Sequence, residues 1–146
     1  MTQVNFYTLS SEDEQSRWQL ACRLAEKAAG LGHGVFLQVE HEDAVRQLDS
    51  LLWEYRPASF LPHGLAAARD GETRSAGTPP VLIGTSTRHA AGLDVLINLS
   101  SKPCVEPDRF QKINEILSTD PDILAAGRAN YRNYQNLGYS LQTHKL

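Results

Sequence analysis

Three short apolar runs constrain the fold of this chain more than any other feature. Residues 35–39, 81–84 and 93–99 are each dominated by aliphatic and aromatic side chains. A strand that is apolar at almost every position has to be covered on both faces, and parallel sheets flanked by helices provide that cover. The runs therefore predict an α/β fold with a mostly parallel central sheet.

A helical pattern lies on each side of the first of these predicted strands, residues 35–39. Ser11 and Glu14 have the spacing of a capping box, and small residues then recur at three- and four-residue steps over 18–29. Such a small-residue face is typical of a helix that lies close against a sheet. The glycines within 30–34 are expected to form its C-cap and a tight turn, and a second helix is predicted over 42–53. This alternation indicates right-handed βαβ units.

Two more helices are predicted in the second half of the chain. One begins at Pro107 and has an inner face of four apolar residues: Phe110, Ile113, Ile116 and Leu117. The other begins at Asp120-Pro121 and runs to about residue 136, where Gly138 stops it.

The remaining segments complete one domain, residues 1–146. Strands are predicted over 4–9 and 139–143, and residues 56–63 read as a linker with at most one short strand. Residues 66–80, rich in Gly, Pro and Ala, are expected to form a surface loop that carries no recognisable motif.

Charge and composition exclude several function classes. The formal net charge of −3 disfavours a protein that coats nucleic acid, although a local basic patch is compatible with it. The N-terminus has no signal-peptide pattern, and no apolar run approaches the roughly 20 residues that span a bilayer. Cys22 and Cys104 have no partner motif, so buried free thiols in a reducing cytoplasm are expected.

No motif in the sequence indicates a catalytic site or a cofactor site. The turn after the first strand, residues 9–14, lacks phosphate-binding glycines and carries three carboxylates where an anion would bind. The five histidines show no metal-ligand spacing. We therefore expect a non-enzyme with no cofactor and no metal. The alternative is a small α/β hydrolase or transferase whose pocket, at the strand C-termini, is lined by residues such as Ser86 and Asp94.

The strongest candidate binding segment lies near the C-terminus. Arg128 and Arg132 are four residues apart, so they share a helix face, and Tyr131 and Tyr134 flank that face. Gly138 follows at the helix end. Guanidinium groups beside aromatic rings suit an acidic peptide with a bulky apolar residue. The alternative is a solvated arginine face with the tyrosines packed on the sheet.

A second candidate surface surrounds Trp53 and Phe60. Both aromatic residues lie near a predicted helix end and a loop that contains Pro62. Such rings either fill the core or form a hydrophobic docking patch, and the pattern alone leaves both interpretations open.

These segments, in this order, resemble a known family. The residues Leu52-Trp53…Phe60-Leu61-Pro62-His63, the opening Val4-Asn5-Phe6-Tyr7, the strand Asp94–Leu99 and the ending Arg128…Gly138-Tyr139 are similar to the chi subunit of bacterial DNA polymerase III holoenzyme. The resemblance covers nearly the whole chain. It implies an α/β domain of nucleotide-binding-like topology without a bound nucleotide, acting as a non-catalytic accessory subunit of the clamp-loader complex in DNA replication.

The resemblance also implies partners. Arg128, Tyr131, Arg132 and Gly138 would bind the acidic, phenylalanine-ended tail of single-stranded-DNA-binding protein. Trp53, Phe60 and Pro62 would bind the psi subunit, and through psi the clamp loader.

Contact with DNA would then be indirect, in a cytoplasmic, nucleoid-associated replisome and away from any membrane. A repair helicase is a further candidate for the Trp53 and Phe60 surface. The family often has a basic residue one turn before Arg128, where this chain has Leu124, so one charged contact to the tail is missing.

Overall fold

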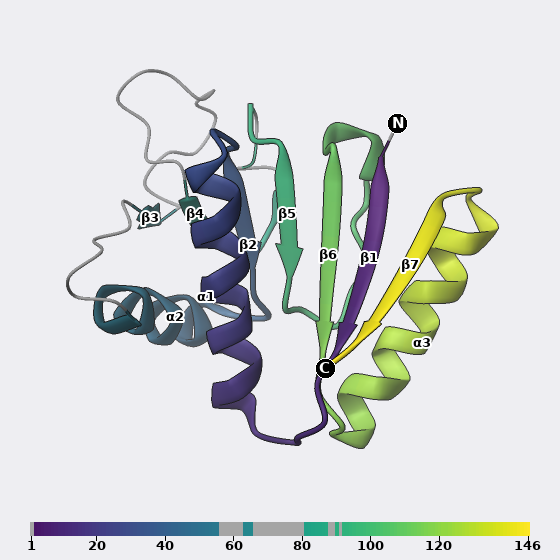
Figure 1. Ribbon diagram of the computed structural model, residues 1–146, viewed down its shortest axis with the longest axis horizontal. Helices are drawn as coiled ribbons and strands as arrows, with labels where there is room; N and C mark the ends of the chain where they lie inside the picture. The colour runs from purple at the N-terminus through teal and green to yellow at the C-terminus, as the bar shows by residue number, and fades with distance from the viewer. Residues whose placement is uncertain (1, 56–62, 66–80, 88–89, 91) are drawn as a thin grey trace.

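The computed structural model describes residues 2–55, 63–65, 81–87, 90 and 92–146. Strands and helices alternate over the first part of the chain as predicted, but four described strands then follow one another before the last helix and the last strand (Figure 1). In chain order the elements are β1 (Gln3–Thr8), α1 (Glu14–Gly30), β2 (Val35–Gln38), α2 (Glu42–Tyr55), β3 (His63–Leu65), β4 (Val81–Gly84), β5 (Val95–Asn98), β6 (Lys112–Leu117), α3 (Pro121–Asn136) and β7 (Ser140–Lys145). The predicted surface loop at 66–80 lies outside the described residues.

The described strands form a seven-stranded sheet in the order β3-β4-β2-β5-β6-β1-β7. Every strand pair is parallel, which confirms the predicted fold class. The helices α1 and α2 cover one face of the sheet, over β2, β4 and β5, whereas α3 packs against the other face at β6 and β7 (Figure 1).

Two separate apolar clusters result from this arrangement. On the α1 side, Ala21, Cys22 and Ala25 are fully buried against the central strands, so the small-residue face brings α1 close to the sheet as predicted. On the α3 side, Phe6 and Tyr134 are buried with the opposite faces of the same strands. The central strands β2, β4 and β5 are buried at every position, which is why their sequences are nearly continuous in apolar residues.

The helix ends agree with the sequence with one exception. Gly32 has a φ of +90°, as a turn after α1 requires. The N-cap of α1 is Asp13 rather than Ser11, because α1 begins one residue after Asp13, whose carboxylate accepts a hydrogen bond from the Gln15 N–H. The Ser11 hydroxyl instead accepts from the Asp13 N–H, and the predicted capping box is wrong.

The helix predicted from Pro107 is also wrong. Residues Pro107–Arg109 form only a single 3₁₀ turn, and β6 follows in the middle of the sheet, between β5 and β1. The apolar spacing of Ile113, Ile116 and Leu117 imitates a helix because the intervening Asn114 and Glu115 are polar. Both of these polar residues are buried and hydrogen-bonded in the folded protein.

Two further expectations concern the cysteines and the membrane. Cys22 and Cys104 are free and buried, as predicted, and burial raises the pKa of their thiols to about 12 and about 11 respectively. Within the described ranges, no helix is both long enough and apolar enough to cross a bilayer.

Candidate functional site

The candidate site is built on helix α3, whose ends are set by local chemistry. Asp120 caps the first turn, where one carboxylate oxygen accepts hydrogen bonds from the Asp122 and Ile123 N–H groups at 2.9 and 3.2 Å. Pro121 occupies the first turn, where its missing N–H costs nothing. Beyond the last turn Gly138 adopts a φ of +90° and turns the chain into β7.

The inner face of α3 lies very close to β6. Gly127 is buried, and a Cβ placed there would lie 2.5 Å from the Leu117 Cδ1 atom. Glycine at this position therefore lets the helix approach the sheet directly over β6. This close contact fixes the distance of the exposed face of α3 from the core.

A buried polar network holds the same helix in register. The Tyr134 hydroxyl donates to the Glu115 carboxylate at 2.8 Å and accepts from the Cys104 N–H at 2.8 Å. The Asn98 amide donates to the same Glu115 oxygen at 2.8 Å. Burial raises the pKa of Glu115 to about 7, although the donors from Asn98 and Tyr134 act in the opposite direction.

The outer face of α3 brings the predicted tail residues together. Arg128 and Arg132 are exposed one helical turn apart, and neither forms an ion pair with any described residue. Tyr131 lies at the boundary between this face and the core, because its ring packs edge-on against Phe6 with 5.2 Å between centroids. Gly138 is exposed just past the end of the helix.

Two residues of this segment differ from the simplest expectation. Tyr134 does not flank the arginines, since its side chain is fully buried and belongs to the core. For this tyrosine the alternative interpretation, packing on the sheet, is correct. Leu124 is half-buried one turn before Arg128, so it supplies an apolar surface at that position.

Sequence reasoning missed the polar groups that position α3. Glu115, Asn98 and Asn130 were not singled out, because each looks like an ordinary surface residue when taken alone. The available signal was a carboxylate and an asparagine inside runs of aliphatic residues at 95–98 and 112–117. Buried polar residues of this kind need partners, and here they find one another.

The second candidate surface is only partly within the described structure. Trp53 lies in the last turn of α2, at the end of the sheet formed by β3 and β4. Phe60 and Pro62 lie outside the described residues, as does the side chain of Trp53. The helix α2, which carries Trp53, and the helix α3 lie toward opposite edges of the seven-stranded sheet (Figure 1).

The place where an open α/β sheet binds phosphate is occupied by protein groups. At the C-terminal ends of β5 and β6, the buried Arg17 donates from Nε to the Ile116 carbonyl oxygen at 2.8 Å and from one terminal nitrogen to the Leu99 carbonyl oxygen at 2.9 Å. Its other terminal nitrogen pairs with the Glu14 carboxylate at 2.7 Å. The guanidinium is therefore committed to protein oxygens, in accord with the absence of a phosphate-binding turn.

The residues of the alternative enzyme site are not brought together. Asp94 directly precedes β5, and its carboxylate accepts a hydrogen bond from the Gly34 N–H at 3.2 Å. Ser86 follows the C-terminal end of β4. Because β4, β2 and β5 are parallel neighbours, Asp94 lies at the N-terminal ends of these strands and Ser86 lies at their C-terminal ends. A cavity of about 260 Å³ at the strand C-termini is lined by Arg17, Glu40 and Ser101, among others, and includes neither of them.

Comparisons with known proteins agree with the sequence resemblance. The family model described as "DNA polymerase III chi subunit, HolC" matches residues 1–142. The chain is 38% identical to DNA polymerase III subunit chi of Pseudomonas aeruginosa, over 100% of this chain and 98% of that protein. It is 26% identical to the chi subunits of Haemophilus influenzae and Escherichia coli, with 98% of this chain covered in each case. The chain therefore belongs to the chi subunit family of DNA polymerase III, a replication accessory subunit.

Proposed function

We propose that this protein is a non-catalytic adaptor of the replicase that binds two protein partners at separate surfaces. One surface, Arg128, Tyr131, Arg132 and Gly138, binds the acidic C-terminal tail of single-stranded-DNA-binding protein. The other, Trp53, Phe60 and Pro62, binds the psi subunit and through it the clamp loader. The protein thereby links the cytoplasmic replisome to coated lagging-strand DNA.

The observation that carries the tail proposal is the pair of exposed guanidinium groups on α3 that have no ion pair with the described residues. Arg128 and Arg132 therefore offer donors to a ligand, and guanidinium binds carboxylates in a two-pronged geometry. The half-buried ring of Tyr131 is held by Phe6, so it offers a rigid wall to an apolar side chain. Gly138 has no Cβ and leaves open space at the helix end.

The separation of the two surfaces supports a bridging role. The tail residues lie on α3 beside β6 and β7, whereas Trp53 lies on α2 beside β3 and β4. A partner bound at one edge of the sheet would leave the other edge accessible, so both partners can be bound at the same time.

A peptide titration tests the tail site. A labelled acidic peptide that ends in phenylalanine should bind with micromolar affinity, as a small charged interface gives. Arg128→Ala and Arg132→Ala should each weaken binding about tenfold or more, the size of a lost charge-assisted contact. Arg23→Ala removes an exposed arginine of α1 and is the matched control. Equal affinity in all four proteins would refute the assignment.

A substitution at Leu124 tests the tail site by adding a positive charge instead of removing one. Leu124→Lys places a cation one helical turn before Arg128 on the same face. The added charge should strengthen peptide binding a few fold at low salt, since exposed pairs contribute roughly 0.2 to 1 kcal/mol. A variant with unchanged or weaker binding and an intact circular dichroism spectrum would place the tail elsewhere.

The psi surface is tested by co-purification. Trp53→Ala and Phe60→Ala should each lose psi while the peptide titration remains at the wild-type value, because the tail site is at the other end of the sheet. If psi is retained by both variants, the psi surface lies elsewhere, whereas the tail site is unaffected by that result.

A further inference from the structure

The face of the sheet opposite α3 is polar beside α1, where it is only partly covered by the described helices. The strands β6, β1 and β7 carry α3 on one face. On the opposite face, the parallel register aligns Gln3 and Asn5 of β1 with Lys112 and Asn114 of β6. The helix α1 packs over β2, β5 and β6, and no described helix packs closely on the same face of β1 and β7. The side chains of Gln3, Tyr7 and Lys112 remain at least partly exposed beside α1, whereas Asn5 and Asn114 are buried at the base of this face.

This face is organised by contacts between its own side chains. The Gln3 amide donates to the Gln142 side-chain oxygen at 3.1 Å, and the Asn5 amide donates to the Asn114 side-chain oxygen at 3.2 Å. The rings of Tyr7 and His144 stack with centroids 4.7 Å apart and an interplanar angle of 18°. The amides and the stacked rings are thus held in a fixed arrangement rather than being free surface side chains.

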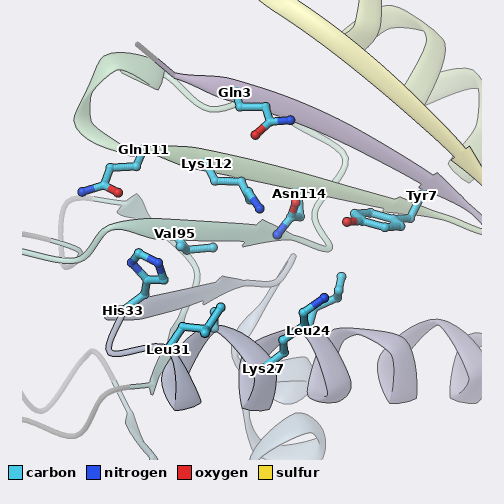
Figure 2. Close-up of a pocket in the computed structure, with 11 residues that line it drawn as sticks. Gln3, Tyr7, Leu24, Lys27, Leu31, His33, Val95, Gln111, Lys112 and Asn114 are labelled. Carbon is cyan, nitrogen blue, oxygen red and sulfur yellow. The ribbon is translucent and has the colours of Figure 1, made fainter.

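A cavity of about 450 Å³ lies between this face and α1. Figure 2 shows Lys27 and Leu24 of α1 facing Lys112 and Asn114 of β6 across it, with the Tyr7 ring at one end. None of its eleven lining residues is acidic. At the cavity edge, however, the Asp94 carboxylate oxygen Oδ2 lies 3.5 Å from Nδ1 of His33. Because His33 already has this partner, Lys27 and Lys112 are the two cations available to a ligand.

We propose that this face, defined by Tyr7, Lys27, Lys112 and Asn114, binds a short segment of single-stranded DNA. The two lysines suit phosphate oxygens, the amides suit the polar edges of bases, and an aromatic ring beside a cationic groove is how single strands are held without sequence preference. A base must be unpaired to enter a cavity of this size, so a duplex is not accommodated.

The charge balance sets the strength of this contact. With a formal net charge of −3 and two lysines in the site, the interaction is weak for the free protein. It becomes significant when another contact holds the protein beside the strand, because tethering raises the effective concentration. The inference goes beyond the proposed function, since the face lies across the sheet from α3 and does not depend on the tail residues.

Fluorescence anisotropy with a labelled oligothymidylate tests the proposal on the full chain. Two phosphate contacts predict that raising salt from 50 to 200 mM weakens binding about sevenfold, from a slope of about −0.7 per contact. The double variant Lys27→Gln/Lys112→Gln should abolish this salt dependence. Lys145→Gln is the matched control, because Lys145 is exposed but adjacent to His144 and therefore on the opposite face.

The outcomes separate this site from the tail site. Arg128→Ala should leave oligothymidylate binding unchanged even if it abolishes peptide binding. Amide chemical-shift mapping of the wild type should place the perturbed residues on β1, β6 and α1. The proposal would be overturned if no binding were seen at millimolar protein, or if the Lys145→Gln control lost as much of the salt dependence as the double variant. Amide chemical-shift changes confined to α3 would also overturn it. A duplex of the same sequence that binds equally well would overturn it as well.

Discussion

The substitution Glu115→Gln tests whether a buried carboxylate limits the stability of this domain at neutral pH. Glu115 is 1% exposed, and burial raises its pKa from 4.5 to about 7. The folded protein therefore holds a proton that the unfolded chain has already lost in this range. The contribution of Glu115 to stability is therefore largest below about pH 4.5, falls as the pH rises toward about 7, and is constant above that.

The size of this loss follows from the two pKa values. A difference between 4.5 and about 7 corresponds to about 3 kcal/mol, at about 1.4 kcal/mol per pH unit. Glutamine keeps the shape and the acceptor oxygen but never ionises. Tyr134 and Asn98 donate to a neutral oxygen in the glutamine variant, as they do in the protonated wild type, so their hydrogen bonds add no further difference. At pH 8 we therefore expect Glu115→Gln to be about 3 kcal/mol more stable than the wild type.

Urea denaturation at several pH values between 4.5 and 8 measures the effect. The difference in unfolding free energy between wild type and Glu115→Gln should increase with pH and level off above about 7. Glu12→Gln removes an exposed carboxylate and is the control for a general change of charge. If the unfolding free energies of wild type and Glu115→Gln change in parallel with pH over this range, the pKa of Glu115 is not raised by burial.

Three further predictions concern α3 and its ligand. Tyr134→Phe removes the hydroxyl that donates to Glu115, and we expect a loss of about 1 to 3 kcal/mol in urea denaturation. Gly127→Ala should destabilise the protein by about 1 to 3 kcal/mol because its methyl group meets Leu117, whereas Gly30→Ala, which has open space, should stabilise it by about 0.5 to 1 kcal/mol in the same assay. Raising the salt concentration should weaken binding of the acidic peptide severalfold in the titration, since both partners are exposed charges, and a salt-independent affinity would contradict the charged site.

The comparison of β6 with α3 shows where sequence reasoning succeeded and where it failed. Helix α3 was predicted from Asp120 to about residue 136 because its cap, its proline and its terminal glycine are all local signals. Strand β6 was predicted as a helix because its buried Asn114 and Glu115 interrupt the apolar pattern. A strand between two others can bury polar residues only if distant partners satisfy them, and no local pattern reveals such partners.

The sequence by itself determined the α/β class, the parallel sheet, the ends of α3 and the shared face of Arg128 and Arg132, because these depend on periodicity and helix-end chemistry. The tertiary structure alone decided that Tyr134 belongs to the core, since its partner Glu115 is 19 residues away. It also decided that Asn5 and Asn114 are buried together beside α1, although they lie 109 residues apart in the sequence. Contacts of this kind arise from the order of the strands, which depends on how the whole chain packs.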